Sequence, residues 1–329
     1  MQSTSRIVAT LLAGVGIALI VAGLVAPRFL IGDGRLPLGL ENTTWTLKDT
    51  DGSYLGEPAP VTRQLHMEVQ NPADAETASV RIGDTLRAGD AGSDFDNLVT
   101  ATTWTYALDR TSGEPVGDMR LQTVMGMPET TVSGAGHWLK FPTNVQQQTY
   151  EVFDPVLRAT APAEFAGEGT LGGREVYTFT QTIPPTNVAL TYADMRNTMT
   201  LQGPDDEPIR AFYFHSAERE LTVDQVSGLV VDISESVDDF YGDAQARRLQ
   251  DIVAYDATMD PAQAAALAQQ LGTVFSMAQS RALTLGVIGL GSVLTLAGAL
   301  GALGVFNRSR RAQSGEPTRA HRRQGSARA

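Results

Sequence analysis

Two long apolar runs, one near each end of the chain, constrain this sequence more than any other feature. Residues 7–26 and 282–306 contain no ionisable side chain. A membrane-spanning helix needs about 20 mostly apolar residues, and each run is long enough. We therefore predict transmembrane helices over residues 7–29 and 282–306. They enclose an extracytoplasmic domain of residues 30–259 and a juxtamembrane helix over residues 260–281.

Arginine residues predict the orientation of these helices. Residues 307–329 hold seven arginines against one acid, and Arg6 precedes the first run. Short basic flanks stay on the cytoplasmic side of a membrane. We therefore expect the N-terminal residues 1–6 and the basic tail 307–329 in the cytoplasm, and the central domain on the other side of the cytoplasmic membrane. The basic tail should contact anionic membrane lipids. It lacks aromatic residues, so we expect no nucleic-acid partner.

The first apolar run could instead be a cleaved signal peptide. Small residues end at Ala26, as at a cleavage site, but Pro27 follows directly and disfavours cleavage. The run also exceeds the 7–15 apolar residues of a typical signal peptide. These two observations favour an uncleaved membrane anchor.

Small residues in both runs indicate close helix packing. Such residues let the backbones of two membrane helices approach each other. The second run offers several glycines, and the first carries a four-residue repeat of small side chains. The other run of the same chain is the expected partner, and self-association or an envelope protein is the alternative. The candidate packing residues are Gly14, Ala18, Ala22, Ala26, Gly298 and Gly301.

The central domain is predicted to be rich in antiparallel strands. Leu65, Met67 and Val69 alternate with polar residues, and residues 98–108 and 174–183 are rich in threonine and aromatic residues. Residues 220–233 read as a hairpin with a glycine in its turn. The fold class is therefore membrane-anchored α+β. The chain has no cysteine, which excludes disulfides and zinc–thiolate sites.

One helix is expected at the end of this domain. Asp260 is a good N-cap, and Pro261 suits the first helical position. Alanine-rich sequence with an apolar stripe follows. We expect this helix to pack on the domain and to continue towards Arg281 and the second apolar run.

Histidine and acidic residues give no recognised metal-ligand spacing. His66 and Glu68 would share one face of a strand, and His215 lies near Glu218 and Glu220 in sequence. We interpret these as isolated surface groups, and we predict neither a metal site nor a cofactor. Three further groups look unrelated to binding: His137 beside Trp138 suggests packing, Asp238-Asp239 reads as solvated loop charge, and the acids at 90, 94 and 96 lack the calcium-loop pattern.

No catalytic motif is present. Residues 167–172 spell G-x-G-x-x-G, but a strand-like segment follows where a dinucleotide site needs a helix. We therefore interpret this glycine-rich segment as a turn between strands. Nucleophile elbows, zinc-protease and phosphate-loop motifs are all missing. The sequence predicts a protein that is not an enzyme.

Several local phrases resemble a known family. They are Lys140-Phe-Pro, residues 149–154 (TYEVFD), residues 172–179 (GGREVYTF) and residues 222–232 (TVDQVSGLVVD). Together with the two flanking spans, they resemble the actinobacterial PorA porin family, long described as a domain of unknown function. The layout also resembles the class B scavenger receptors, whose β-rich domain between two terminal spans holds a lipid-conducting tunnel.

Three functions follow as expectations. The first is a non-enzymatic cell-envelope protein whose domain binds or transfers an apolar ligand, namely a lipid. The second is a pore, as the family name implies. The third is a scaffold or regulator of an envelope complex, suggested by the small residues of the first span.

Overall fold

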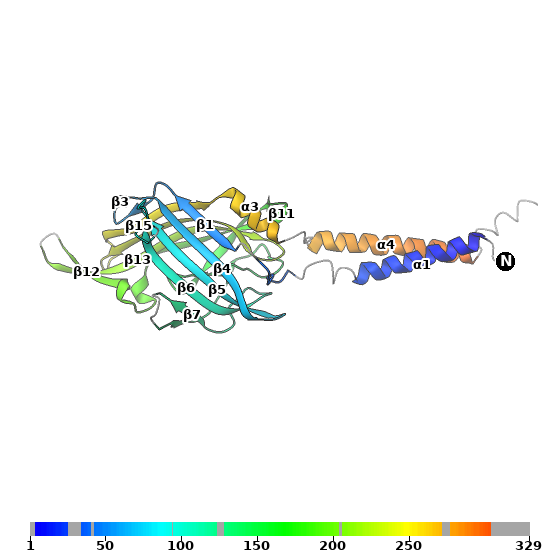
Figure 1. Cartoon of the computed structure of the whole chain (residues 1–329), viewed down its shortest axis with the longest axis horizontal. Helices are drawn as coiled ribbons and strands as arrows, with labels where there is room; N and C mark the ends of the chain where they lie inside the picture. The colour runs from blue at the N-terminus through cyan, green and yellow to red at the C-terminus, as the bar shows by residue number, and fades with distance from the viewer. Residues whose placement is uncertain are drawn as a thin grey trace, which may run out of the picture. The chain divides into compact units, whose positions relative to one another are not determined.

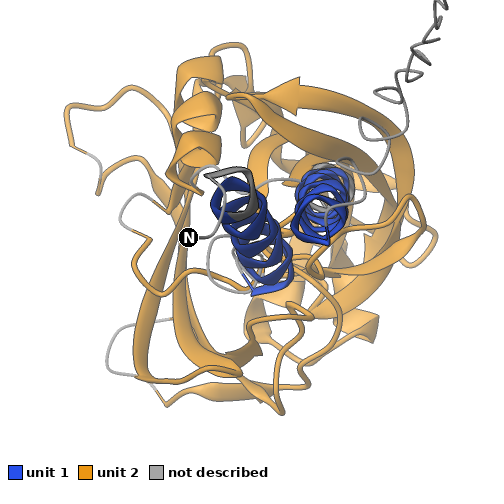
Figure 2. Cartoon of the chain, turned by 90° about the vertical axis from the view of Figure 1, so that its right-hand side faces the viewer, with its two compact units in different colours: residues 1–31, 278–329 blue, residues 32–277 orange. Residues whose placement is uncertain are grey.

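The computed structural model describes residues 4–25, 34–40, 43–93, 95–123, 128–203, 206–271 and 277–303. The chain forms two compact units (Figure 2). The first contains residues 1–31 and 278–329, and the second contains residues 32–277. The two apolar runs therefore form one unit, and the predicted β-rich domain forms the other.

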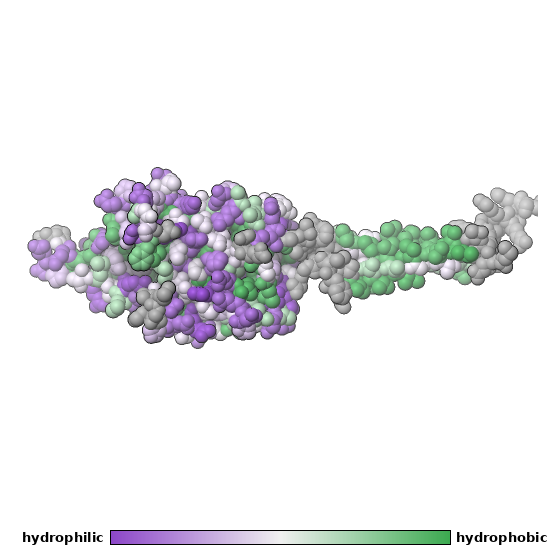
Figure 3. Space-filling model, viewed as in Figure 1, coloured by the Kyte–Doolittle hydropathy of each residue, from purple (hydrophilic) through white to green (hydrophobic). Residues whose placement is uncertain are grey.

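The first unit is a pair of apolar helices, α1 (Thr4–Val25) and α4 (Met277–Ala302). Ile7–Val25 and Ala282–Ala302 are long and apolar enough to cross a membrane. Only 17% and 11% of these windows are buried, so neither helix is the core helix of a soluble fold. Their exposed surface is almost uniformly hydrophobic (Figure 3), as lipid contact requires. The predicted spans extend to residues 29 and 306, which lie outside the described part of the chain.

The second unit is built on strands (Figure 1). The first half of the chain supplies β1 (Thr44–Asp49), β2 (Ser53–Tyr54), β3 (Glu57–Pro58), β4 (Val61–Ala73), β5 (Thr77–Ala88), β6 (Leu98–Asp109), β7 (Met119–Gln122) and β8 (Thr130–Val132). The second half supplies β9 (Tyr150–Asp154), β10 (Ala159–Leu171), β11 (Arg174–Asn187), β12 (Thr198–Gln202), β13 (Pro208–Asp224), β14 (Val230–Gly242) and β15 (Arg248–Met259). Two 3₁₀ turns, η1 (Val188–Leu190) and η2 (Met195–Asn197), precede β12.

All of the described strands join one sheet. Its order is β8-β7-β6-β5-β4-β1-β15-β14-β13-β11-β10-β9, with β12 paired to β13 and the short β2 paired to β15 and β3. Named neighbours pair antiparallel, as predicted, and most pairs are consecutive hairpins. The exceptions are β1 with β4, β11 with β13, and β1 with β15 at the centre, where Leu47 lies opposite Met259. The sheet curves around an interior (Figure 2), so each strand has one inner and one outer face.

Side-chain alternation produces these two faces. On β4, Leu65 and Met67 are buried, as their spacing predicts, while His66 and Glu68 are exposed. The predicted hairpin is also confirmed, because β13 and β14 pair antiparallel and Gly228 has a φ of 71° in their connection. An added Cβ at Gly228 would lie 2.1 Å from the carbonyl oxygen of Phe141, so the turn requires glycine.

Helix α3 (Pro261–Gln270) begins where it was predicted. The Asp260 carboxylate accepts a hydrogen bond of 2.7 Å from the Ala262 backbone N–H, and Leu267 is buried against the sheet. The helix ends at Gln270, and its predicted continuation towards Arg281 falls on residues that are only partly described. Residues 272–276 lie outside the described part of the chain.

Candidate functional site

Opposite charges face each other on the inner face of strands β13 and β14. Arg219 lies in register with Glu235, and its Nε donates to Glu235 Oε2 at 3.0 Å. Two alternations earlier on the same face, His215 Nδ1 lies 2.7 Å from Asp239 Oδ1. Each of these four residues is at most 6% exposed. Two buried cross-strand ion pairs therefore stand side by side inside the sheet.

The pairs extend into a larger network across the interior. Arg63 of β4 donates to Glu235 at 2.5 Å and forms two hydrogen bonds with Asp84 of β5. On the other side, Arg219 donates to Asp154 of β9 at 2.7 Å. Strands β4 and β14 are three places apart in the sheet, so only strong curvature brings these side chains together. We call the set the ionic layer: Arg63, Asp84, Asp154, His215, Arg219, Glu235 and Asp239.

Mutual pairing fixes the protonation state of this layer. Burial opposes the charge on His215, but Asp239 and Asp154 outweigh it and raise the pKa of His215 to about 9. Burial likewise opposes the charge on Glu235, but Arg63 and Arg219 lower its pKa to about 2. At neutral pH His215 is therefore protonated and Glu235 is ionised, and each lies beside an opposite charge.

A pocket of about 350 Å³ adjoins the ionic layer on the inner side of the sheet. Asp84 and Tyr213 connect the two, because both line the pocket and Tyr213 donates to Asp239 at 2.6 Å. We call this hollow the inner pocket. Aliphatic, aromatic and threonine side chains form most of its wall, including Tyr54, Val99, Thr100, Thr102, Trp104, Leu121, Val156, Tyr192, Tyr241 and Ile252.

Two smaller cavities lie next to the inner pocket. A second cavity of about 100 Å³ shares Asp84 and Tyr213 with it and reaches His215 and Arg219. A third, of about 20 Å³, lies beyond Arg219 against Trp138 and Phe153. Trp104 packs edge-on against both of these rings, at centroid distances of 5.8 and 5.3 Å. This aromatic cluster therefore borders both the inner pocket and the smallest cavity.

Two arginines stand at the wall of the inner pocket. Arg158 lies 3.5 Å above the ring of Tyr192, and its Nη2 is 3.5 Å from Asp194 Oδ2. Arg196 pairs with the same carboxylate at 3.2 Å. The side chain of Arg158 is only 10% exposed, whereas that of Arg196 is 55% exposed. One carboxylate thus serves two guanidinium groups.

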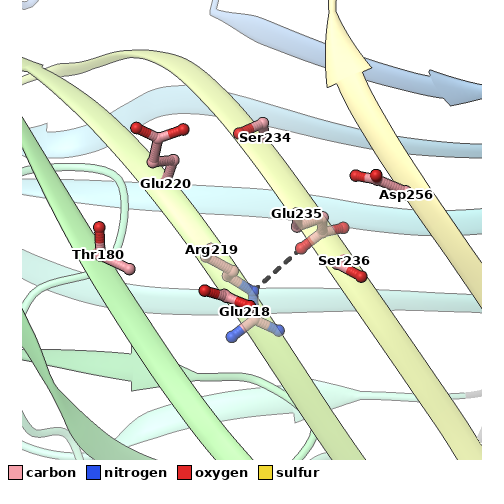
Figure 4. A pocket seen from close by; sticks show the side chains of 8 residues that line it. All are labelled: Thr180, Glu218, Arg219, Glu220, Ser234, Glu235, Ser236 and Asp256. Atoms are coloured by element: carbon pink, nitrogen blue, oxygen red, sulfur yellow. Dashed lines mark hydrogen bonds and ion pairs between the residues drawn. The ribbon is translucent and has the colours of Figure 1, made fainter.

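A hollow of about 370 Å³ also lies on the outer face of β11, β13, β14 and β15. Figure 4 shows the acids Glu218, Glu220 and Asp256 there, beside serine and threonine side chains. All three acids are exposed. The described residues contain no group of three or more potential metal ligands, so we interpret this face as an ordinary solvated surface of the sheet.

The structure separates residues that are close in sequence. His215 faces the interior, while Glu218 and Glu220 face outward, so they form no cluster. The interpretation of His215 as a surface group is therefore wrong, because only 1% of this residue is exposed. Asp239 is likewise buried in β14 and is not a solvated loop charge.

One other sequence interpretation is confirmed, and a second is confirmed in part. His137 packs in the core: it stacks on Phe141 at 5.5 Å, and burial with nearby Lys140 lowers its pKa to about 4. The glycine-rich segment 167–172 is a turn only at its end: residues 167–171 lie within β10, and Gly172 and Gly173 form the turn to β11. His66 lies on one face with Glu68, with 3.6 Å between Nε2 and Oε1.

The helix-packing residues divide into two groups. Gly298 lies against α1, where an added Cβ would be 2.4 Å from the Ala13 nitrogen, and Gly301 faces Ala9 at 3.0 Å. Gly14 has no other atom within 4 Å of an added Cβ, and Ala18 and Ala22 are exposed. Ala26 lies outside the described residues.

Other glycines make the closest helix contacts. An added Cβ on Gly16 would clash with Thr295 and Gly291, and one on Gly23 would clash with Ile288. Along α1 these contacts recur at intervals of three or four residues, with Ala9 and Ala13 on the same face, and they descend along α4, so the helices are antiparallel. The sequence prediction used a strict four-residue repeat, which includes Gly14. The observed contact face instead alternates between three- and four-residue steps, as one face of a helix does.

Comparisons with known proteins agree on one family. The model of the family described as Porin PorA matches residues 8–300. A Porin PorA of Corynebacterium amycolatum is 26% identical over 219 residues, which cover 57% of this chain and 56% of that protein. A Porin PorA of Corynebacterium resistens is 26% identical over 220 residues, which cover 55% and 53%. The chain thus spans about half the length of these curated relatives. Since the family match extends from α1 to α4, this chain belongs to the Porin PorA family.

Proposed function

We propose that this protein forms a pore in the cell envelope, as the name of its family implies. The observation that carries the proposal is the family match over residues 8–300, which includes both apolar helices and the whole sheet. The proposal concerns passage of solutes and requires no catalytic residue.

The structure constrains how such a pore would form. The hydroxyls of Ser292 and Thr295 donate to carbonyl groups of their own helix, at 2.8 Å each. The membrane-length windows Ile7–Val25 and Ala282–Ala302 contain no ionisable side chain, and they offer few free polar groups to line a water-filled path. Conduction would accordingly need several copies of the chain.

Planar-bilayer recording of the purified full chain tests this proposal. We expect conductance steps whose frequency rises with more than the first power of protein concentration, because several copies must assemble. Detergent buffer without protein is the control. Absence of conductance over a wide concentration range would exclude the pore.

A second candidate function is favoured by the inner pocket. Ligand sites are concave, mostly apolar and about 300–1,000 Å³ in volume, with a few polar groups. The inner pocket has about 350 Å³ and a wall of aliphatic and aromatic side chains. We propose that the domain binds an apolar ligand, such as a membrane lipid, and hands it on.

Mass spectrometry of small molecules that purify with the full chain tests the second candidate. We expect a stoichiometric apolar ligand, lost when Thr102→Trp fills the pocket. A chain that carries no such molecule and binds no added lipid would exclude it.

The arrangement in the membrane belongs to the same proposal. The seven arginines of residues 307–329 support a cytoplasmic position for both termini and an extracytoplasmic position for the sheet. The outward position of Gly14, Ala18 and Ala22 leaves a small-residue face for a second copy or another envelope protein.

A further inference from the structure

The guanidinium of Arg158 has few partners for a group so deeply placed. It is 10% exposed and carries five N–H donors. Among the described residues, its hydrogen bonding consists of one long contact, 3.5 Å from Nη2 to Asp194 Oδ2. The ring of Tyr192 covers one of its faces at 3.5 Å. Several N–H groups of Arg158 therefore remain available at the wall of the inner pocket.

The charge at this wall is positive. Arg158 and Arg196 share the single carboxylate of Asp194. Asp194 itself is not part of the pocket lining. Asp84 is, and both of its oxygens accept hydrogen bonds from Arg63. An anionic group placed beside Arg158 would therefore meet an excess of cationic donors, and it would not displace the ionic layer.

Much of the remaining lining is apolar. Val99, Leu121, Val156 and Ile252 contribute aliphatic surface, and Trp104 adds an aromatic ring. Binding there should be driven by burial of hydrocarbon. The pocket thus combines a cationic corner with an apolar body.

We propose that the inner pocket binds an amphipathic anion, with its carboxylate or phosphate held by Arg158 and its hydrocarbon part against the aliphatic wall. This inference rests on the second candidate function and specifies its ligand class. A guanidinium suits both oxyanions, because its planar donors can bind two oxygens together. Arg196, at the exposed side of Asp194, contributes a second positive charge.

Calorimetric titration of the full chain, in nanodiscs of zwitterionic lipid, tests the proposal with three probes: octanoate, octyl phosphate and octanol. They share the hydrocarbon chain and differ in the head group. We expect both anions to bind about tenfold or more tightly than octanol, the size of a charge-assisted hydrogen bond. The stronger of the two anions indicates whether a fatty acid or a phospholipid head group is the natural source.

Variants separate the possible outcomes. Arg158→Gln should reduce the affinity for both anions to that for octanol. The control Arg120→Gln, at an arginine whose side chain is 63% exposed, should leave all three affinities unchanged. Arg158→Lys should restore part of the preference, which a merely misfolded pocket would not do. Equal binding of anions and octanol to the unmodified chain, or anion binding unchanged by Arg158→Gln but abolished by Thr102→Trp, would overturn the proposal and leave the second candidate intact. Failure of all three probes would overturn both.

Discussion

The buried carboxylate of Glu235 offers a direct test of the ionic layer. Replacement by glutamine keeps the shape of the side chain and removes its charge. Glu235 accepts hydrogen bonds from Arg63, Arg219 and Tyr255, and its pKa falls from 4.5 to about 2. One pKa unit corresponds to about 1.4 kcal/mol, so Glu235→Gln should cost roughly 3 kcal/mol at pH 7. Breaking a buried ion pair costs a similar amount.

The pH dependence of this cost has a definite sign. Because folding lowers the pKa of Glu235, its contribution is complete above the unfolded value of 4.5 and is lost as the pH falls towards 2. We therefore expect the difference between the variant and the unmodified chain to shrink to about half or less at pH 3.

Urea unfolding of the full chain in detergent, followed by tryptophan fluorescence, measures this difference. All three tryptophans are buried, so their emission should report loss of the interior. Glu220→Gln, on the exposed outer face of β13, is the matched control and should change stability by less than about 0.5 kcal/mol. A cost for Glu235→Gln below about 1 kcal/mol, or one that is equal at pH 7 and pH 3, would refute the reasoning.

Two further predictions concern the helices. The chain has no cysteine, so Ala9→Cys combined with Gly301→Cys should form an intramolecular disulfide, whereas Gly14→Cys combined with Gly301→Cys should not. Gel mobility without reductant measures the crosslink. Equal crosslinking of both pairs would contradict the helix register. For topology, a membrane-impermeant maleimide should label Ser53→Cys in intact cells and Ser314→Cys only after permeabilisation, and the reverse pattern would invert the proposed orientation.

The strands were predictable where one face is purely apolar. Leu65 and Met67 alternate with His66 and Glu68, and this period places them on β4 without further knowledge. The N-cap at Asp260 was predictable for a similar reason, because capping is decided by neighbouring residues. Local patterns sufficed in both places.

The ionic layer was not predictable in this way. On β13 the outward Glu218 and Glu220 flank the inward Arg219, so charge marks both faces and the alternation signal disappears. A bulge between Thr222 and Val223 also shifts the register of the hairpin before it reaches Arg219. The inner pocket depends on strands far apart in sequence, which no local pattern reveals.

The pairing of β1 with β15 has a consequence for biogenesis. Leu47 cannot pair with Met259 until residue 259 has been synthesised. Until then β1 has an unpaired edge. Contacts of such long sequence separation form slowly. Helix α4 begins at Met277, a short distance beyond β15. The sheet can therefore be completed only shortly before the second apolar helix is synthesised. A nascent chain truncated before residue 248 would lack β15, the strand that joins the two halves.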